Sequence, residues 1–375
     1  MRAIDLPIEL RRKMAPRLGE NFFGPSPSVF VGHFGYPNVN VGPMGALEER
    51  QEIDDPSTWI KKDYADIIEL RSLLVRSKQQ QSIFSKGRFV GDVQDISLAV
   101  NNPDIELGFK KKPLMKISFS QYTQPMGPTG TIDKFRLAEN PKIPKYMEAA
   151  TASDVRAKES AWMLYKKDVD VYKITTVLSA GTLGIDKKLV PTRWSITATD
   201  DIIGKQLISG IRDFKQIEEA RVFESQNLDN HFLIFLIPGS WEFENFEAWS
   251  KGSYWMFSEG AVAIEEEYEP FQGRKSYAEK QAGGYYASRL GIVEYLHKIK
   301  RQARVLAIRE IYEGYSVPLG VWQVRQGVRE AFSQQPEKFS SLKEAFDYGK
   351  ARLKWPLDLY LKKSRMLQQR KLLDF

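Results

Sequence analysis

The segment His231–Phe243, HFLIFLIPGSWEF, limits the folds open to this chain more than any other part of the sequence. Its apolar run from Phe232 to Ile237 is unbroken and is stopped by a Pro-Gly pair, which is typical of a strand buried on both faces. A strand of this kind requires neighbouring strands and a covering layer on each side. With 375 residues, the chain can build one large domain or two closely packed ones around such a sheet.

The hydrophobic pattern changes along the chain. Strand-like patterns are concentrated before Arg274, and helical periodicity dominates after it. Besides the buried strand, we expect strands within Lys116–Ser120, Tyr172–Thr199 and Ser253–Glu267. We expect helices within Asp63–Ser77, Asp92–Val100, Thr151–Lys167, Tyr277–Tyr312, Leu319–Ser333, Ser341–Lys354 and Leu357–Met366. The pattern predicts an α+β fold: a mixed-sheet body over residues 1–273, a helical basic part packed on it over 274–366, and a free tail over 367–375.

Residues 24–45 form a Gly- and Pro-rich segment, GPSPSVFVGHFGYPNVNVGPMG. Prolines every few residues exclude a helix, and the β-favouring run Val29–Val31 indicates an extended or edge-strand segment. A flexible linker would not carry Phe30, Phe34 and Tyr36, so we expect the segment to pack on the body. Its glycines suit places where the backbone turns sharply or approaches a neighbour closely.

The amino-acid composition excludes several classes of protein function. The chain has no cysteine, which excludes disulfides, thiolate catalysis, iron–sulfur clusters and Cys-ligated zinc. The three histidines, His33, His231 and His297, are scattered, so no zinc site is expected and any metal would be a hard divalent cation held by carboxylates. No P-loop, dinucleotide-binding fingerprint or nucleophile-elbow motif indicates a cofactor.

The sequence predicts a cytoplasmic protein with no membrane partner. Its longest strictly apolar run is far shorter than the roughly 20 residues that cross a bilayer core. The first residues, MRAIDLPIELRRKM, lack the apolar region of a secretory signal.

Charge is distributed unevenly along the sequence. Residues 274–375 contain 21 Lys+Arg against 10 Asp+Glu, whereas residues 1–273 contain 34 against 38. A slightly acidic body followed by a basic final quarter suits an anion-binding C-terminal part. A basic helical surface without a partner would have the same composition.

The segment Leu189–Asp201, LVPTRWSITATDD, is a candidate site. If Trp194–Thr199 is a strand, one of its faces carries Arg193, Ser195, Thr197 and Thr199, a guanidinium and three hydroxyls that suit a phosphate or ribose. Asp200 and Asp201 then follow at the strand end, where a metal or a general base could stand. The alternative is an exposed sheet face that ends in a helix cap.

The segment Glu269–Arg289, EPFQGRKSYAEKQAGGYYASR, mixes cations with aromatic rings. This pattern suits phosphate binding and base stacking, as in proteins that bind single-stranded nucleic acid. The candidate binding residues are Arg274, Lys275, Tyr277 and Arg289. The alternative is a tightly packed helix whose tyrosines lie in the core and whose Gly283-Gly284 pair permits a close helix crossing.

Two further groups are candidates for chemistry. His33 lies in the Gly/Pro-rich segment, where it could act as a base or a nucleophile or could simply pack. Glu242, Glu244 and Glu247 follow the Pro-Gly turn and could be metal ligands or a solvated edge.

The chain ends in QQRKLLDF, in which Gln369, Leu372 and Phe375 are three residues apart. On a 3₁₀ turn these side chains share one face, and together they suit a hydrophobic pocket beside a polar one. The tail resembles the peptide by which replication and repair proteins bind the sliding clamp PCNA, although a second aromatic residue is missing. The alternative is a last turn packed on its own body.

Five segments together resemble the archaeal Nre family: VFVGHFGYPNVNVGPMG, VPTRWSITATDD, GSWEFENFEAW, GRKSYAEKQAGGYYASRLGIVEYL and PLGVWQVRQGVREAF. The resemblance spans nearly the whole chain. It implies a DNA repair protein that is linked to PCNA and that removes AMP from 5′-adenylated DNA. Some relatives carry an N-terminal Cys-rich zinc motif, which does not carry over to a chain without cysteine.

Three functions fit these observations. The first is a repair phosphohydrolase in which Arg193, Arg274 and Lys275 bind phosphate while Asp200, Asp201 or His33 positions water or acts as nucleophile. The second is a non-catalytic DNA-binding adaptor that brings other repair proteins to PCNA. The third is an RNA- or nucleotide-processing enzyme whose clamp-like tail is fortuitous.

Overall fold

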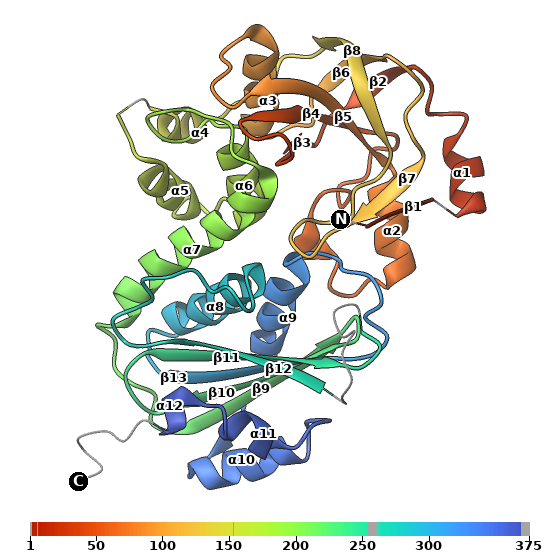
Figure 1. The fold of residues 1–375 in the computed structure, drawn as a ribbon. Coiled ribbons are helices and arrows are strands. Elements are labelled where there is room, and N and C mark those ends of the chain that lie inside the picture. The colour runs from red at the N-terminus through yellow and green to blue at the C-terminus, as the bar shows by residue number, and fades with distance from the viewer. Residues whose placement is uncertain (1, 6, 153, 254–261, 369–375) are drawn as a thin grey trace. The chain divides into compact units, whose positions relative to one another are not determined.

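A computed structural model describes residues 2–5, 7–152, 154–253 and 262–368 (Figure 1). The chain divides into two compact units, Met1–Ile203 and Gly204–Phe375. The division expected after residue 273 falls inside the second unit, between β12 (Val262–Glu269) and α8 (Gly283–Lys298). Among the described residues, no helix has both the length and the apolar character needed to span a membrane.

The first unit contains a six-stranded mixed sheet with the strand order β2-β6-β8-β5-β4-β3. All neighbours in it are antiparallel except β5 and β8, which are parallel. The strands are β2 (Asn21–Pro25), β3 (Ser28–Val31), β4 (Asn38–Ala46), β5 (Leu74–Ser82), β6 (Asp104–Phe109) and β8 (Thr129–Leu137). A separate antiparallel pair joins β1 (Arg2–Asp5) to β7 (Lys116–Phe119).

One face of this sheet forms the core of the first unit. Val41 of β4 and Val75 of β5 pack with Val93 and Ile96 of α3. Because side chains alternate along a strand, Arg76 and Lys78 of β5 point away from this core. The helices of the unit are α1 (Ile8–Met14), α2 (Tyr64–Ser72), α3 (Arg88–Leu98), α4 (Lys145–Ala150), α5 (Ala157–Tyr165), α6 (Val171–Ser179) and the first part of α7 (Thr192–Ile211), with a 3₁₀ turn at Pro56–Thr58.

The second unit is a layered α/β/α arrangement around a sheet of order β12-β11-β13-β10-β9-β14. Figure 1 shows α8 and α9 (Trp322–Ser333) on one face of this sheet and the last three helices on the other. The remaining strands are β9 (Ala220–Asn227), β10 (Asn230–Ile237), β11 (Glu242–Ser250), β13 (Arg304–Ile311) and β14 (Glu337–Phe339). The last helices are α10 (Leu342–Lys350), α11 (Leu357–Leu361) and α12 (Arg365–Gln368).

The expected α+β fold and its central buried strand are confirmed. Every residue of β10 is buried, because the strand lies between β9 and β13 and is covered by a helical layer on each face. The Gly/Pro-rich segment is extended, as expected, and contributes β2, β3 and β4.

The strand expected within Tyr172–Thr199 is wrong, because this segment forms α6 and the start of α7. Asp170 caps α6 by accepting a hydrogen bond from the backbone N–H of Tyr172, at 2.8 Å. The buried positions Val171, Ile174 and Leu178 follow helical spacing, which overrides the β-favouring residue types between them.

The helix expected within Tyr277–Tyr312 is wrong beyond Lys298, where α8 ends. Residues Arg304–Ile311 form β13, which lies between β10 and β11 in the middle of the sheet. A strand buried on both faces has no alternating pattern, so its apolar residues extended the apparent helical period. Likewise α2 ends at Ser72 and β5 begins at Leu74, inside the helix expected to reach Ser77.

Candidate functional site

A histidine and an arginine meet in the first unit beside the edge strand β3. The start of α7 is tied to β3 by a hydrogen bond of 3.0 Å from the Val31 N–H to Thr192 Oγ1. This contact places Arg193 Nη1 3.1 Å from Nε2 of His33, two residues beyond β3. The Arg193 guanidinium also lies over the ring of Tyr122, at 4.2 Å from its centroid.

The His33 ring is held in its neutral form. Burial lowers its pKa below the ordinary value of 6.5, and the positive charge of Arg193 lowers it further. Because arginine can only donate, Nε2 of His33 accepts the hydrogen bond and the ring proton lies on Nδ1. At neutral pH this residue is therefore an unprotonated base, as a general base or nucleophile requires.

Exposed aromatic rings surround this pair. Phe34, Tyr36 and Trp194 are 68%, 49% and 45% exposed. The rings of Tyr36 and Trp194 lie 5.2 Å apart, and those of His33 and Phe34 lie 4.0 Å apart. Large exposed rings beside a cation are the stacking surfaces used by proteins that bind single-stranded nucleic acids.

The single face expected to carry Arg193, Ser195, Thr197 and Thr199 does not exist, because these residues lie on helix α7. At 100° per residue, Arg193 and Thr197 share a side with Asp200, whereas Ser195 and Thr199 point the opposite way and are fully buried. Asp200 is fully buried and Asp201 partly buried, and each interacts with another group. Both aspartates lie within the helix, so neither stands at a strand end or caps the helix.

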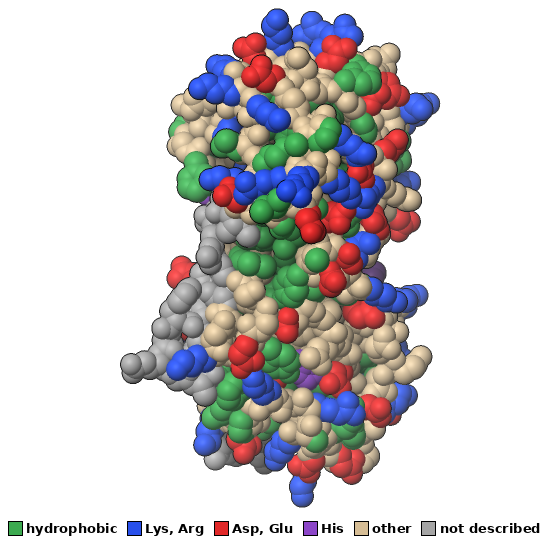
Figure 2. Space-filling view, turned by 90° about the vertical axis from the view of Figure 1, so that its right-hand side faces the viewer, with side chains coloured by type: hydrophobic (Ala, Val, Ile, Leu, Met, Phe, Trp, Pro, Cys, Tyr) green, Lys and Arg blue, Asp and Glu red, His purple; other side chains and the backbone are tan. Residues whose placement is uncertain are grey.

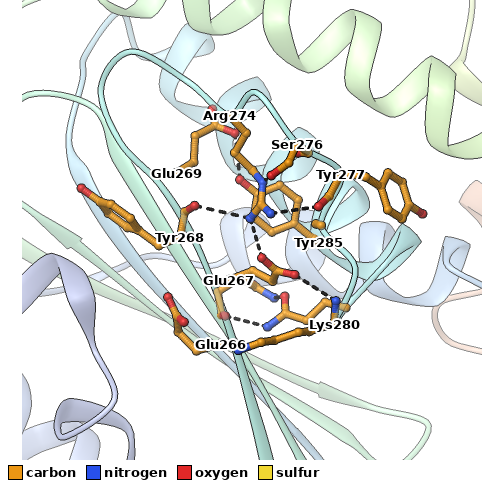
Figure 3. A network of polar contacts seen from close by, with 12 residues as sticks. Glu266, Glu267, Tyr268, Glu269, Arg274, Ser276, Tyr277, Lys280 and Tyr285 are labelled. Atoms are coloured by element: carbon orange, nitrogen blue, oxygen red, sulfur yellow. Dashed lines mark hydrogen bonds and ion pairs between the residues drawn. The ribbon is translucent and has the colours of Figure 1, made fainter.

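The second group of predicted binding residues, within Glu269–Arg289, lies in the second unit. Arg274 and the backbone of Lys280 bind the carboxylate of Glu267 there (Figure 3). The Arg274 guanidinium donates to Glu267 Oε2 at 2.6 Å and to the Tyr277 carbonyl at 3.1 Å. The other carboxylate oxygen of Glu267 accepts the Lys280 N–H at 3.0 Å. Burial alone would lower the pKa of Arg274, but the Glu267 hydrogen bond and the electrostatic interactions with Glu267, Tyr285 and Tyr286 together outweigh it, and the pKa is raised. Arg274 thus connects the end of β12 to the loop that precedes α8 through hydrogen bonds.

Arg289 forms a buried ion pair in the same unit. Its Nη1 lies 2.6 Å from Glu269 Oε2, which also accepts a hydrogen bond of 2.8 Å from the Tyr285 hydroxyl. Gly284 permits a close approach within the protein, since a Cβ there would lie 2.6 Å from Glu247 Oε1. Of the residues predicted here, Lys275 and Tyr277 are exposed.

The carboxylates Glu242, Glu244 and Glu247 do not converge on one point. Alternation along β11 puts Glu247 on the face of the sheet opposite to the other two. Glu247 binds Arg309 at 2.8 Å, and Glu244 accepts hydrogen bonds from Ser364 and the backbone of Arg365. Within the described ranges, no group of three potential metal ligands comes together.

The basic C-terminal quarter is largely neutralised inside its own unit. The second unit contains 26 Lys+Arg against 23 Asp+Glu, and the first contains 29 against 25. Figure 2 shows the two signs interspersed over the visible face. Cations after residue 273 pair with glutamates before it: Arg274–Glu267, Arg289–Glu269, Arg304–Glu242, Arg309–Glu247, Lys338–Glu219, Arg352–Glu224 and Arg365–Glu266.

The sequence interpretation missed Tyr122, which packs on Arg193, and the two cations Arg76 and Lys78 on the outer face of β5. For Arg76 and Lys78 a signal was present: in LVRSKQQQS, cations at alternate positions follow an apolar pair. Tyr122 lies in a loop without periodicity, so no local pattern connects it with Arg193.

Comparison with known proteins assigns the family. The family model described as the N-terminal part of archaeal Nre proteins matches residues 7–256, and the model of the C-terminal part matches residues 269–375. The chain belongs to the archaeal Nre family. The expected resemblance is therefore confirmed, and the matched Nre proteins are named DNA repair proteins.

Three Nre relatives are equally similar in identity. DNA repair protein NreA of Archaeoglobus fulgidus is 34% identical over 343 residues, covering 90% of this chain and 86% of the relative. NreA of Haloferax volcanii is 34% identical over 330 residues, covering 84% and 79%. DNA repair protein NreB of A. fulgidus is 34% identical over 355 residues, covering 93% and 90%. No solved structure is significantly similar to the chain.

The predicted PCNA-binding residues Gln369, Leu372 and Phe375 lie outside the described residues, which end at residue 368. Binding of the clamp by this Nre chain therefore stays a prediction from its sequence.

Proposed function

We propose that this Nre protein acts in archaeal DNA repair and that its first unit binds a DNA end at His33, Arg193 and the exposed rings around them. The matched relatives are named DNA repair proteins. The observation that carries the proposal is the contact between a neutral histidine and an arginine beside the exposed Tyr36 and Trp194. Rings of this kind stack on bases, and a guanidinium binds phosphate.

The reaction that we propose is removal of AMP from 5′-adenylated DNA, whose pyrophosphate joins AMP to the DNA end. Arg193 turns from His33 to a substrate phosphate, which frees the Nε2 lone pair of His33. His33 then takes a proton from a water molecule that attacks the phosphorus of AMP. One P–O bond forms to the water oxygen, the P–O bond to the DNA phosphate breaks, and AMP and 5′-phosphorylated DNA leave.

Release of AMP from a 5′-adenylated oligonucleotide tests this reaction. We expect the full chain to release AMP, His33→Ala to lower the rate by about 10²- to 10⁴-fold, and Arg193→Met to lower it as well. The matched control is His297→Ala, because His297 is exposed in the second unit and should not change the rate.

Two outcomes would alter the proposal. A covalent adduct between His33 and AMP, trapped by denaturation at alkaline pH because its P–N bond is labile in acid, would replace the general base by a nucleophile. No AMP release, with DNA binding retained, would favour the non-catalytic adaptor.

We further propose that the tail recruits the protein to PCNA through Gln369, Leu372 and Phe375. The support is their spacing in the sequence: a 3₁₀ turn at these positions would present an amide, an aliphatic and an aromatic group on one face. Binding of immobilised PCNA should be lost in Leu372→Ala and Phe375→Ala but kept in Lys371→Ala, since Lys371 lies off that face. Equal binding by all three variants would exclude the tail as the binding element.

A further inference from the structure

The partly buried side chain of Arg76, in the first unit, has no hydrogen-bond or ion-pair partner among the residues that the structure describes. It lies on β5, in the middle of the six-stranded sheet, and points to the face opposite the hydrophobic core. Its buried Nε has no hydrogen-bond acceptor, and no carboxylate reaches its guanidinium among the residues that the structure describes. The guanidinium lies over the ring of Phe30, 4.8 Å from its centroid. Burial lowers the pKa of Arg76 to about 10.

The hydroxyl group of Thr129 lies on the strand next to Arg76 and also lacks a hydrogen-bond partner among the described residues. Thr129 of β8 is the register partner of Arg76, so the two side chains project from neighbouring strands on the same face. Thr129 Oγ1 is itself buried. Arg76 Nε and the Thr129 hydroxyl, two groups that can donate, thus lie on neighbouring strands without an acceptor among the described residues.

The same pairing repeats one step along the strands. Lys78 is the register partner of Thr131, two residues after Arg76 and Thr129. Two residues of strand span about 6.6 Å, a separation comparable with that of consecutive phosphates in an extended nucleic-acid strand. The four residues Arg76, Lys78, Thr129 and Thr131 are named the β5–β8 ladder below.

Arg76 is only partly buried, but burial of part of a cation is still unfavourable unless an anion or acceptor offsets the lost hydration. Arginine and hydroxyl groups together fit the oxygens of a phosphate, which can accept from several donors at once. A carboxylate of the protein would have satisfied Arg76 permanently, and none of the described residues supplies one.

We propose that the β5–β8 ladder is a phosphate-binding surface that holds the backbone of a DNA strand whose end lies at His33 and Arg193. Phe30 connects the two places: its ring contacts Arg76, and its Cε1 lies 3.5 Å from where a Cβ at Gly32 would stand, one residue before His33. The choice of DNA as the ligand rests on the proposed function. The assignment of phosphate rests on the ladder itself.

The salt dependence of binding tests the ladder. Fluorescence anisotropy would follow a labelled single-stranded oligonucleotide, without adenylation, binding to the full chain at several salt concentrations. We expect Arg76→Met and Lys78→Met each to weaken binding about tenfold and to reduce the slope of log K against log salt by about 0.7, the value for one lost phosphate contact. Thr129→Val should weaken binding with the slope unchanged.

The matched control is Arg136→Met. Arg136 lies on β8, is 66% exposed at its side chain and pairs with Glu106, so its loss should leave affinity unchanged and change the slope far less. Unchanged affinity and slope in both Arg76→Met and Lys78→Met would overturn the proposal. If Arg76→Met fails to fold, the proposal is tested with Lys78→Met and Thr129→Val. Lys78 is partly exposed and Thr129 is uncharged, so both variants should fold.

Binding experiments with two further ligands identify the source of the phosphate. An oligonucleotide with a neutral methylphosphonate backbone should lose the dependence on Arg76 and Lys78 if backbone phosphates are bound. Binding of inorganic phosphate by the wild-type chain but not by Arg76→Met, together with oligonucleotide binding that is equal in the two, would instead assign a free phosphate and would overturn the DNA assignment. Because none of these measurements uses AMP release, loss of the ladder effects with AMP release intact would overturn this inference alone.

Discussion

Arg76 in the first unit and Arg309 in the second occupy similar positions. Each lies on an inner strand of a six-stranded sheet and faces a phenylalanine ring, Phe30 at 4.8 Å and Phe232 at 5.9 Å. Arg309 is satisfied within the protein: it donates to Glu247 at 2.8 Å, to Asn230 at 2.8 Å and to Gln323 at 3.2 Å. Arg76 has no such acceptor among the described residues.

The contrast is between a buried arginine, Arg309, and a partly buried one, Arg76. Where the fold supplies a carboxylate and amides, as around Arg309, the guanidinium ties strands and helices together. Around Arg76 the described residues supply a ring and a hydroxyl, and we propose that the acceptor is a phosphate of the ligand. If Arg76 binds phosphate as proposed, the number of internal acceptors is a better guide to a binding arginine than the density of cations in the sequence.

The largest expected effect is on the stability of the second unit. Arg309→Met leaves Glu247 buried without a counter-charge and should lower the free energy of unfolding by about 3–5 kcal/mol. Urea unfolding measures this change. Arg136→Met, which breaks the exposed pair with Glu106, should stay within about 1 kcal/mol and serves as the control. A loss below 1 kcal/mol in Arg309→Met would mean that the pair does not organise the unit.

A smaller effect is expected on DNA affinity at the aromatic rings. Trp194→Ala removes a stacking face and should weaken single-stranded DNA binding by about 1–3 kcal/mol, with the salt slope unchanged. Tyr146→Ala is the control, because Tyr146 is an exposed aromatic residue of α4 in the same unit. Equal losses in both variants would show that the rings around His33 are not a specific surface.

The next effect is on the stability of the first unit, and its sign is opposite to that of Arg309. Arg76→Met removes a partly desolvated charge that has no acceptor among the described residues, so the free energy of unfolding should rise, by at most about 1 kcal/mol. Urea unfolding in buffer without phosphate measures it. A loss as large as in Arg309→Met would erase the distinction between the two arginines.

The smallest effect concerns proton binding by His33. Its pKa is lowered first by burial and then by Arg193, so Arg193→Met should raise it towards 6.5 without fully restoring it. A lowered pKa in the folded state favours the neutral ring, so the stability linked to His33 and any AMP release are lost as pH falls through that pKa.

Histidine proton resonances in an NMR titration measure this shift directly. The chain has only three histidines, and His33→Gln assigns the resonance. An unchanged His33 pKa in Arg193→Met would show that Arg193 does not act on the ring in solution.

Some features of the site could be predicted from the sequence because they depend on residue type. His33 was singled out by its position in a Gly/Pro-rich segment with aromatic neighbours, and Arg193 by the hydroxyl residues around it. Their contact joins residues 160 positions apart. No local pattern encodes it, since it depends on α7 docking against β3 through Thr192.

The roles of Arg274 and Arg289 could not be predicted because their partners lie on other elements. In the sequence they belong to a basic quarter, and in the structure Glu267 and Glu269 of β12 neutralise them. Alternation along β12 puts both carboxylates on the face that carries α8. The sequence contains the charges, but the sheet decides which of them meet.

By itself, the sequence determined the central strand β10, the mixed α+β class and the family, because an unbroken apolar run and long matching segments are local properties. Only the tertiary structure decided that residues 171–179 and 192–211 are helices and that β13 is a central strand. It also decided that Arg76 lacks the acceptors which Arg309 has. The physical reason is that burial on both faces removes the periodicity that local patterns depend on, and that hydrogen-bond and ion-pair partners are chosen by packing between distant segments.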